Sequence, residues 1–506
     1  MFTLLTGLVL AASLAFSPPA GYSALPGSTP SDSDISRWVR FALTHDPRTD
    51  ASYISVETRA GVVKLIGDVD NLAARNYAVA ETKKINGVRG VIDEINVTPV
   101  SRSDRDLAHD IRRRLENSTA VDARNLVVAV HQGVVTLSGE AADWNEKEEA
   151  RLLAEGIRGV KDVVDDVQLE YSDTISDERL TSESRARLAR DVYLSDLPIT
   201  VAVQNGEITL TGSVGNLYEK ERAERSLLWQ NGVKSVINNL KVEPRESYGV
   251  RDTVAVPSDQ ELKRNVEAEL MTDLRLRPEE ISVDAVAGHV MLFGSVPSLR
   301  EKRIAEQDAR DIVGTAWVTN QLIVYRTQRD DSAIRDQIVF NMGTDPYLSK
   351  FNIDVTVAEG VVTLVGDVPS LFEKERAAHL AIDVLGVGKV VNDLSVRGML
   401  ALRDDVLKRQ VVQRLEQDWK IAWVYEHIRV DVTDDVVRLT GDVNTWSERQ
   451  EAGRVALRTH GVLAVDNRLT VRGVPYPWDE WHSKMPGYFG LYDPYEIYYP
   501  YRREGS

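Results

Sequence analysis

The stretch Gly133-Val134-Val135-Thr136-Leu137-Ser138-Gly139 recurs as Gly360-Val361-Val362-Thr363-Leu364-Val365-Gly366, and related stretches end at four other glycines. Apolar and polar residues alternate within them with the two-residue period of a β-strand. A second alternating run precedes each stretch. In five copies a glycine separates the two runs, and in the sixth copy Asp435, which also tolerates a positive φ, takes its place. Two alternating runs joined in this way predict a β-hairpin.

The glycine that closes each hairpin is followed by a second glycine 20 residues later, and these pairs mark six similar copies. The first glycines of the pairs are Gly67, Gly139, Gly212, Gly294, Gly366 and Gly441. The steps between them are 72, 73, 82, 72 and 75 residues, longer than the roughly 20–50 residues of common solenoid repeats. A copy of this length can bury a small core of its own. The sequence therefore predicts six domains arranged like beads on a string.

Two further blocks in each copy are predicted to be helices. Before the hairpin, apolar residues at helical spacing, such as Ile35, Val39 and Leu43, follow a Ser or Asp that is suited to cap a helix. Between the two glycines lies an amphipathic block, which the second glycine is expected to end as a left-handed cap. This block has an alanine in register in every copy, which suggests that the helix lies close against the sheet there: Ala78, Ala150, Ala223, Ala305, Ala377 and Ala452.

A last alternating run, residues 91–97 in the first copy, predicts a third strand. The fold class is therefore α+β, with six tandem α-β-β-α-β domains of two helices packed on a three-stranded sheet. The predicted parts are a signal peptide at 1–23, domains at 34–100, 103–171, 177–245, 258–326, 331–398 and 402–473, a linker at 246–257 and a tail at 474–506. The linker is the expected hinge between two triplets of domains.

These blocks together resemble the BON domain, which is named for bacterial osmotic-shock and nodulation proteins. The resemblance rests on the hairpin motif at 133–139 and 360–366, the Glu-Lys-x-x-Ala core at 373–377, and the Gly-Val-x-x-Val-x-Asn-x-Leu close at 232–240. It covers about residues 34–473. It implies an envelope or periplasmic location and binding to phospholipid surfaces or envelope partners, and it carries over no catalytic residue.

Composition agrees with an exported protein. Residues 2–16 are apolar and too short to span a bilayer, which predicts the core of a signal peptide cleaved after Ser23, although no Lys or Arg precedes this run. The absence of Cys excludes disulfides, a lipid-attachment cysteine and Cys-based metal sites. A net charge of −17 disfavours nucleic acid and, at long range, anionic lipid. We expect a soluble mature chain without a transmembrane helix, in the periplasm or cell envelope; its oligomeric state does not follow from the sequence.

A basic residue stands eight positions after the first glycine in every copy, at the border of the apolar stripe of the second helix. These residues are Arg75, Lys147, Lys220, Lys302, Lys374 and Arg449. One interpretation is a set of six cations that bind lipid headgroups or a partner. The other, which we favour, is a side chain whose stem covers the edge of the core and whose charge meets a nearby carboxylate.

Other regular polar positions favour structural roles. The third strand carries an Asp or Asn that we expect at an outward or bulged position: Asp93, Asp165, Asn238, Asn320, Asn392 and Asn467. The eight histidines lie at non-equivalent places and form no metal-binding or catalytic motif. We find no phosphate-binding loop and no nucleophile motif. The sequence therefore predicts that the protein is not an enzyme and has no cofactor or metal.

The predicted tail differs from the repeats, because ten of its 33 residues are aromatic. Aromatic side chains with a polar edge suit a hydrated interface with a protein, a glycan or the headgroup zone of a membrane. The candidate interface residues are Trp478, Trp481, Tyr488, Tyr492, Tyr498 and Tyr499. The alternative is a tail that packs back onto the sixth copy or stays disordered.

The sequence thus predicts a non-enzymatic, exported envelope protein that binds phospholipid surfaces or envelope partners through several domains at once, in osmotic or envelope stress. The expected partner is a membrane surface or an envelope protein or glycan, and not nucleic acid. The alternative is a spacer or interaction scaffold of a secretion, adhesion or polysaccharide-assembly system that presents the aromatic tail.

Overall fold

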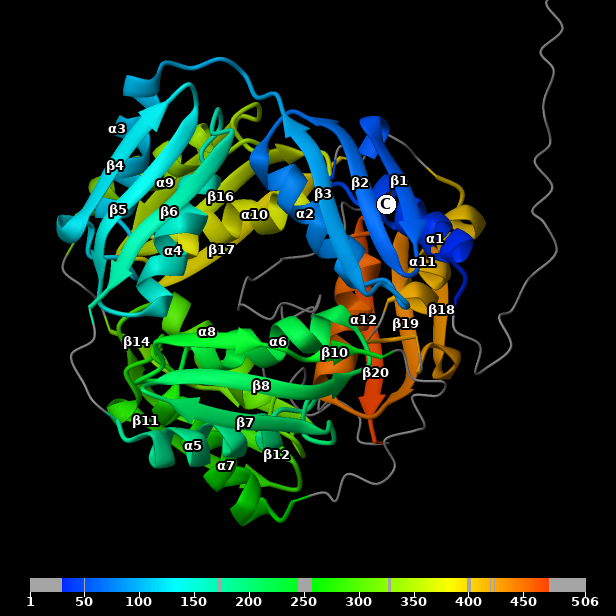
Figure 1. Ribbon diagram of the computed structural model, residues 1–506. Helices are drawn as coiled ribbons and strands as arrows, with labels where there is room; N and C mark the ends of the chain where they lie inside the picture. Colours follow the sequence, from blue (N-terminus) through cyan, green and yellow to red (C-terminus); the bar gives the residue numbers. More distant parts are fainter. Residues whose placement is uncertain are drawn as a thin grey trace, which may run out of the picture.

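The computed structural model describes residues 30–49, 51–170, 175–243, 257–325, 329–397, 402–418, 420–422 and 424–472. The first domain consists of α1 (Asp32–Thr44), β1 (Ile54–Arg59), β2 (Val62–Val69), α2 (Leu72–Lys83) and β3 (Gly90–Val97). Strand β2 is central, antiparallel to β1 and parallel to β3. Both helices pack on one face of this mixed sheet (Figure 1), which confirms the predicted α+β fold.

The same elements recur in the other five domains. The first helices are α3 (Asp104–Glu116), α5 (Asp177–Arg190), α7 (Asp259–Thr272), α9 (Asp331–Thr344) and α11 (Asp404–Gln417). The hairpin strands are β4 (Leu126–His131) with β5 (Val134–Ala141), β7 (Ile199–Gln204) with β8 (Glu207–Val214), β11 (Ile281–Val286) with β12 (His289–Val296), β15 (Ile353–Ala358) with β16 (Val361–Val368), and β18 (Ile428–Thr433) with β19 (Val436–Val443).

The second helices are α4 (Trp144–Glu155), α6 (Leu217–Leu228), α8 (Leu299–Arg310), α10 (Leu371–Ile382) and α12 (Trp446–Leu457). The third strands are β6 (Asp162–Leu169), β17 (Lys389–Val396) and β20 (Ala464–Val471) in domains two, five and six. In domains three and four this strand is split into β9 (Ser235–Asn238) with β10 (Lys241–Val242) and β13 (Trp317–Asn320) with β14 (Ile323–Val324).

A carboxylate from the first helix holds the hairpin turn in five domains. In the first domain Asp32 accepts hydrogen bonds from the backbone N–H groups of Ala60 and Gly61, both at 2.8 Å. These two residues have φ values of 52° and 76°. Asp435 takes the glycine's place in domain six with a φ of 60°, as the repeat predicts. The carboxylates that repeat this contact are Asp104, Asp177, Asp331 and Asp404.

The alanine of each second helix is fully buried, which confirms that the helix lies close to the sheet. The prediction that the second glycine caps this helix is wrong. Helix α2 ends at Lys83 with Lys84 as its C-cap, whereas Gly87, with a φ of 87°, lies three residues beyond that cap. Between them, Ile85 forms a backbone bridge with Asp418 of domain six. The helix is followed by a contact with another domain, which the repeat pattern of one domain does not reveal.

These bridges show that the domains are not beads on a string. They pair domain one with six, two with five, and three with four. The pairs contact one another through domains one and five, three and six, and two and four. The cyclic order is therefore one, six, three, four, two, five, and the ring is closed.

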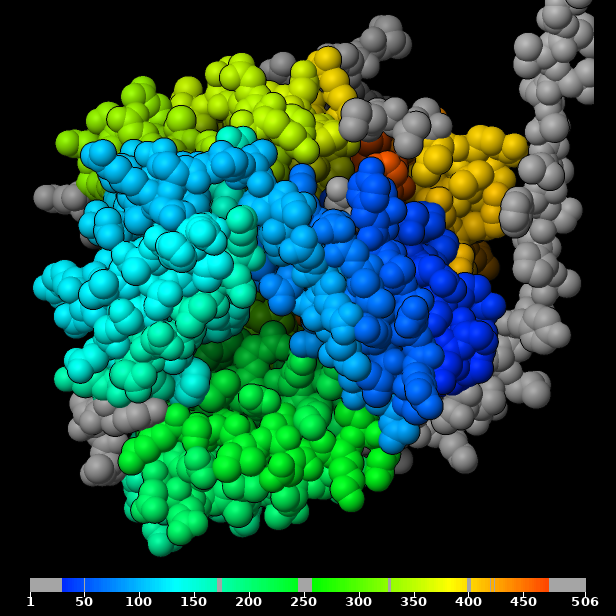
Figure 2. All heavy atoms as spheres, turned by 45° about the horizontal axis from the view of Figure 1, so that its top comes forward, coloured from blue at the N-terminus to red at the C-terminus, as the bar shows by residue number. Residues whose placement is uncertain are grey.

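The ring has two layers of domains. Figure 1 shows the second helices turned toward the centre, with the sheets of domains one, two and three on the side nearest the viewer. Figure 2 shows domains five and six behind domains two and one, and a depression between the domains. The predicted signal peptide, the tail and the linker up to residue 256 lie outside the described residues, and the predicted domain boundaries stay predictions.

Candidate functional site

The six predicted cations all lie on the second helices, at the side of the third strand. Arg75 donates from Nε to Asp93 at 2.6 Å, and Lys147 donates to the backbone carbonyl of Val167 at 2.5 Å. Arg449 is only 1% exposed and donates to the carbonyls of residues 467 and 469, at 2.6 and 2.9 Å. The other three cations are half-buried: Lys220, Lys302 and Lys374. Their role in binding a headgroup or partner stays a prediction.

The Asp or Asn of the third strand faces the second helix and stays in regular register with the central strand, so the expectation of an outward or bulged position is wrong. Where it is Asn, its Nδ2 donates to the helix carbonyl of the basic residue, as Asn392 does to Lys374 at 2.7 Å. Where it is Asp, the side chain of that basic residue approaches the carboxylate instead, as Arg75 does to Asp93. The strand residue therefore fixes the helix on the sheet. The predicted aromatic residues from Trp478 to Tyr499 lie outside the described part of the chain.

Buried arginines of the first helices join two of the domain pairs. Arg187 of α5 is 3% exposed and lies 2.6 Å from Glu269 and 3.3 Å from Asp273, both in domain four. Arg414 of α11 donates to the carbonyl of His45 in domain one at 2.8 Å. In the third pair Arg114 of α3 takes the same position, and the negative charge of Asp345 in domain five lies close to it.

The opposite partner of each pair has no arginine at this position. Ala42, Glu269 and Asn341 stand there in domains one, four and five. An exchange of partners, such as domain two with domain three, would place Arg114 against Arg187. Such like-charge contacts in a buried interface are costly and select one pairing over others.

Asp418, which bridges to Ile85 of domain one, is a buried carboxyl at the interface between domains one and six. Burial and the neighbouring Glu451 raise the pKa of Asp418 to about 7, against the opposing charges of Lys84 and Lys420. Its Oδ1 accepts a hydrogen bond from the backbone N–H of Lys420 at 2.9 Å. An amide could accept the same bond without a charge.

Asp418→Asn is therefore expected to stabilise the protein at pH 8 by about 2 kcal/mol, and to change little at pH 4. The pKa of this carboxyl is raised on folding from 3.8 to about 7, so the wild-type protein loses stability as the pH rises through this window. Urea unfolding and exchange of the Ile85 amide at both pH values measure the difference. Equal gains at pH 4 and pH 8 would contradict the titration of Asp418 as the cause.

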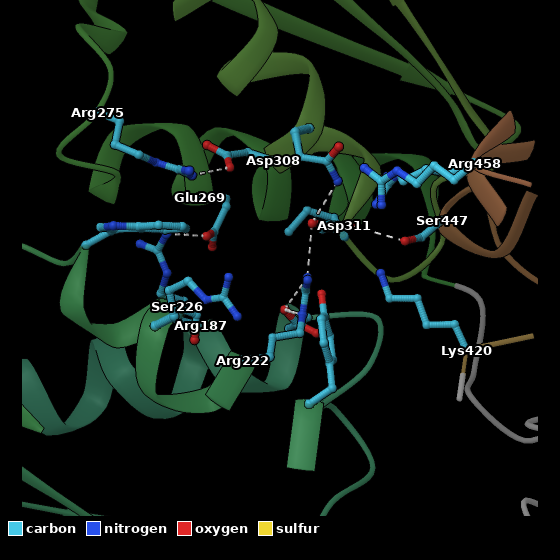
Figure 3. Close-up of a pocket in the computed structure, with 17 residues that line it drawn as sticks. Arg187, Arg222, Ser226, Glu269, Arg275, Asp308, Asp311, Lys420, Ser447 and Arg458 are labelled. Atoms are coloured by element: carbon cyan, nitrogen blue, oxygen red, sulfur yellow. Dashed lines mark hydrogen bonds and ion pairs between the residues drawn. The ribbon is translucent and has the colours of Figure 1, made fainter. Parts of the chain in front are cut away.

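A cavity of about 310 Å³ lies where domains three, four and six meet. Figure 3 shows Arg187, Arg222 and Ser226 of domain three around it, with Lys420, Ser447 and Arg458 of domain six at the right. Its basic lining residues are Arg187, Arg222, Arg225, Arg275, Lys420, Arg454 and Arg458. Its acidic lining residues are Asp191, Glu269, Asp308 and Asp311.

Ion pairs already engage the acidic residues of the cavity. Arg222 lies 2.6 Å from Asp191 and 3.0 Å from Asp311, so it joins domains three and four. Arg275 lies 2.9 Å from Asp308. Together with the pair between Arg187 and Glu269, these contacts leave an excess of positive charge in the cavity.

The basic character extends into the centre of the ring. Burial and the neighbouring arginines Arg303, Arg376, Arg458 and Arg454 hold the pKa of His379 well below its usual value. Burial lowers the pKa of Arg458 too, together with Arg48 and Arg454, which outweigh the nearby carboxylates. These arginines thus gather around His379 in a protein of net charge −17, with the half-buried Glu375 among them. The excess of basic over acidic side chains in the cavity lining favours an anion.

Sequence reasoning missed this cavity because it searched for features common to all copies. The residues that face the centre differ between copies: ten positions after the first glycine stand Tyr77, Glu149, Arg222, Ile304, Arg376 and Glu451. The sequence signal for the cavity was this variation in residue type, at a position three residues along the helix from a buried turn. Which copies meet in the ring could not be read from it.

The fold and its repetition define a class, a protein of tandem α-β-β-α-β modules around a charged centre. The sequence profile of the BON domain matches residues 31–99, 103–171, 176–244, 258–325, 330–398 and 403–473. The chain therefore belongs to the BON domain family. Within the ranges that the structure describes, no helix has both the length and the apolar character needed to cross a membrane.

Two curated proteins share part of this sequence. Osmotically-inducible protein Y of Escherichia coli (strain K12) is 28% identical over 170 residues, which cover 32% of this chain and 85% of that protein. Outer membrane lipoprotein DolP of Haemophilus influenzae is 26% identical over 172 residues, covering 33% and 89%. A structure of CdsD, a structural protein of the type III secretion system of Chlamydia trachomatis, is 17% identical over 44% of this chain and 94% of that chain, with a TM-score of 0.13. That score is too low to support an argument.

Proposed function

We propose that this protein is a non-enzymatic envelope protein that binds a phospholipid surface or an envelope partner through several domains at once. Its BON domains and the names of its relatives, one osmotically inducible and one an outer membrane lipoprotein, support an envelope role. The same similarity supports the proposal that the protein is exported and acts in stress protection. An extended spacer gains no support, because closed contacts between domains replace the string of beads.

The observation that carries the proposal is the outward face of the first three sheets. Ile92, Val164 and Ile237 occupy the same place in the third strands of domains one, two and three, and they are 48%, 42% and 41% exposed. The sheets of these domains lie on one side of the ring (Figure 1). The equivalent positions of domains four and six are polar, Thr319 and Asp466, whereas domain five has the half-buried Val391 there. One side of the ring therefore offers three equivalent apolar contacts, which a single surface can engage together.

Sedimentation with phosphatidylcholine vesicles, with and without phosphatidylglycerol, tests this proposal at low salt. We expect the full chain to bind, and a variant with Ile92, Val164 and Ile237 all changed to Ser to bind about tenfold more weakly, because each exposed side chain contributes part of its burial energy. The matched control changes Val286, Ile323 and Val365 to Ser, which are 55%, 69% and 47% exposed on domains four and five.

A second variant, ending at Gly473, separates the ring from the predicted tail. If it fails to bind while the full chain binds, the aromatic residues Trp478 to Tyr499 carry the contact and the sheet faces do not. If neither protein binds either vesicle, the phospholipid function is rejected. Equal loss in the triple variant and its control would also reject the sheet face of domains one to three.

A further inference from the structure

We propose that the cavity between domains three, four and six binds a small anion that carries a phosphate group. This inference does not depend on the proposed binding of a surface, because the cavity lies at the junction of three domains and the apolar sheet positions lie on their outer faces. The ligand is identified by its chemistry: a phosphate monoester, a pyrophosphate or the phosphate of a lipid headgroup.

The first support is uncompensated charge. The acidic residues of the cavity are paired with Arg187, Arg222 and Arg275. Among the residues that the structure describes, the side chains of Arg225 and Arg458 make no hydrogen bond or ion pair, although both line the cavity. Two guanidinium groups without a direct carboxylate contact thus line the same space, although Glu81 and Glu451 lie close enough to Arg458 to favour its charge. Guanidinium groups bind phosphate oxygens through paired N–H donors, which makes a phosphate the natural partner.

The second support is that two further cations line the cavity beside Glu451. Glu451 lies 2.8 Å from Arg454 and 3.7 Å from Lys420, and both of these cations line the cavity. An anion that carries two negative charges would therefore meet four cations of domains three and six. In a site of reduced dielectric such contacts are stronger than on an exposed surface.

The third support is the set of neutral donors in the same cavity. Ser226, Ser447 and Tyr218 contribute hydroxyl groups to its lining. Burial would raise the pKa of Tyr218, but Lys420, Arg222 and Arg225 outweigh it and lower this pKa to about 8. The tyrosine thus reports the same positive field as the arginines. Ser226 donates to the carbonyl of Ala223 at 3.1 Å and Ser447 donates to Asp311 at 3.4 Å, so a tetrahedral oxyanion would compete with these acceptors for the two hydroxyl donors.

Size and access fit a small ligand. The cavity of about 310 Å³ corresponds to roughly ten water molecules at about 30 Å³ each, enough for a phosphate or pyrophosphate with some water. Arg225 is exposed to solvent, so the cavity is open at that side. A long polyanion would not fit, and a nucleic-acid strand is excluded by the same dimensions.

Titration calorimetry of the full chain with inorganic phosphate and with pyrophosphate, at low ionic strength, tests the proposal. We expect saturable binding, and about tenfold weaker binding for Arg458→Gln and for Arg225→Gln, since each removes one charge-assisted contact. Arg397→Gln is the matched control: it removes the same charge from a side chain that is 75% exposed and paired with Asp367 outside the cavity. Its phosphate affinity should not change.

A thermal-unfolding measurement separates binding from a structural role. Arg458 faces other cations, so Arg458→Gln should melt at or above the wild-type temperature without phosphate, and phosphate should raise the melting temperature of the wild type only. A lower melting temperature with unchanged phosphate binding would overturn the proposal. So would absence of binding at millimolar phosphate, or equal affinity for chloride.

Vesicles distinguish the two sources of phosphate. If the cavity takes a headgroup, saturating pyrophosphate should release the full chain from phosphatidylglycerol vesicles, and Arg458→Gln should bind them less. If vesicle binding is unaffected while pyrophosphate still binds, the ligand is a soluble phosphate compound. The variant with Ile92, Val164 and Ile237 changed to Ser tests the surface function separately. If it loses vesicle binding but still binds pyrophosphate, the result concerns the surface function and leaves the cavity proposal unchanged.

Discussion

Replacing Gly139 with alanine is expected to destabilise domain two by about 3 kcal/mol or more. Gly139 has a φ of 113°, a region that residues with a side chain rarely adopt. A Cβ atom at this position would lie 2.0 Å from the carbonyl oxygen of Asn125. The clash involves backbone on both sides, and Gly139 is paired with Leu126 in the ladder of β4 and β5, so neither segment can move away alone.

Hydrogen exchange measures this effect domain by domain, which a single unfolding curve of a multidomain chain cannot do. We expect faster exchange of the amides of β4 and β5 in Gly139→Ala. Gly343→Ala is the matched control, because this glycine lies in α9, its added Cβ would meet nothing within 4 Å, and alanine is the better helix former by about 0.5–1 kcal/mol. Unchanged exchange in domain two would show that the turn accommodates a side chain.

The same close contact explains why the repeat keeps this glycine. A Cβ on Gly67, Gly212, Gly294 or Gly441 would lie 1.9–2.0 Å from a carbonyl oxygen, and on Gly366 it would lie 2.7 Å away. In each domain this glycine pairs with the first residue of the first hairpin strand, so hairpins of one length require a glycine at the same position of the second strand. The feature that is most regular in the sequence is therefore the one with the strictest geometric cause.

The fold of a single domain could be predicted because its determinants are local. Alternation around Gly206 predicts a hairpin, and the two turn residues Asn205 and Gly206 have φ values of 54° and 78°. The alanine of the second helix is repeated because a larger side chain would separate helix from sheet. The residues that determine the hairpin and the helix packing lie within about 70 residues of one another, and the same pattern occurs in all six copies.

The arrangement of the domains could not be predicted, because its determinants are distant in sequence and differ between copies. Tyr347 of domain five donates to the carbonyl of Arg48 at 2.6 Å, and Tyr193 of domain three donates to Ser447 of domain six. These tyrosines stand where other copies have Arg, Lys or Ala. In a search for common residues such positions look like tolerated variation, whereas they distinguish one interface from another.

The candidate site follows the same rule. The six cations from Arg75 to Arg449 recur in every copy and lie along each domain's own third strand. The cations of the central cavity do not recur in every copy: Arg222 has one arginine equivalent, Arg376 of domain five, and Arg458 has none. They meet only when domains three, four and six pack together. A repeated residue is therefore evidence for the needs of the module, and a departure from the repeat is evidence for the needs of the assembly.

The assembly should depend most strongly on the buried arginines between paired domains, and Arg187→Ala is expected to weaken the contact of domains three and four by about 3 kcal/mol. The substitution leaves the carboxylates of Glu269 and Asp273 buried with less positive charge near them. Arg190, 3.1 Å from Glu269, and Arg275, 2.6 Å from Asp273, remain. The expected loss therefore lies at the lower end of the range for breaking a buried ion pair.

Three backbone hydrogen bonds across this interface report its opening: Val192 N–H to Asp311, Leu274 N–H to Trp229, and Val313 N–H to Arg190, at 2.8, 3.1 and 3.0 Å. Their amides should exchange about a hundredfold faster in Arg187→Ala, while amides of the β7–β8 hairpin stay protected, since about 1.4 kcal/mol corresponds to a factor of ten.

Arg185→Ala is the matched control for this prediction, because Arg185 lies in the same helix and donates within its own domain to the carbonyl of Val201 at 3.0 Å. It should leave the three interface amides protected. If both variants loosen the hairpin and the interface alike, Arg187 supports the fold of domain three and not its pairing. If neither amide set responds, the domains are held by their backbone bridges and the complementary charges only select the partner.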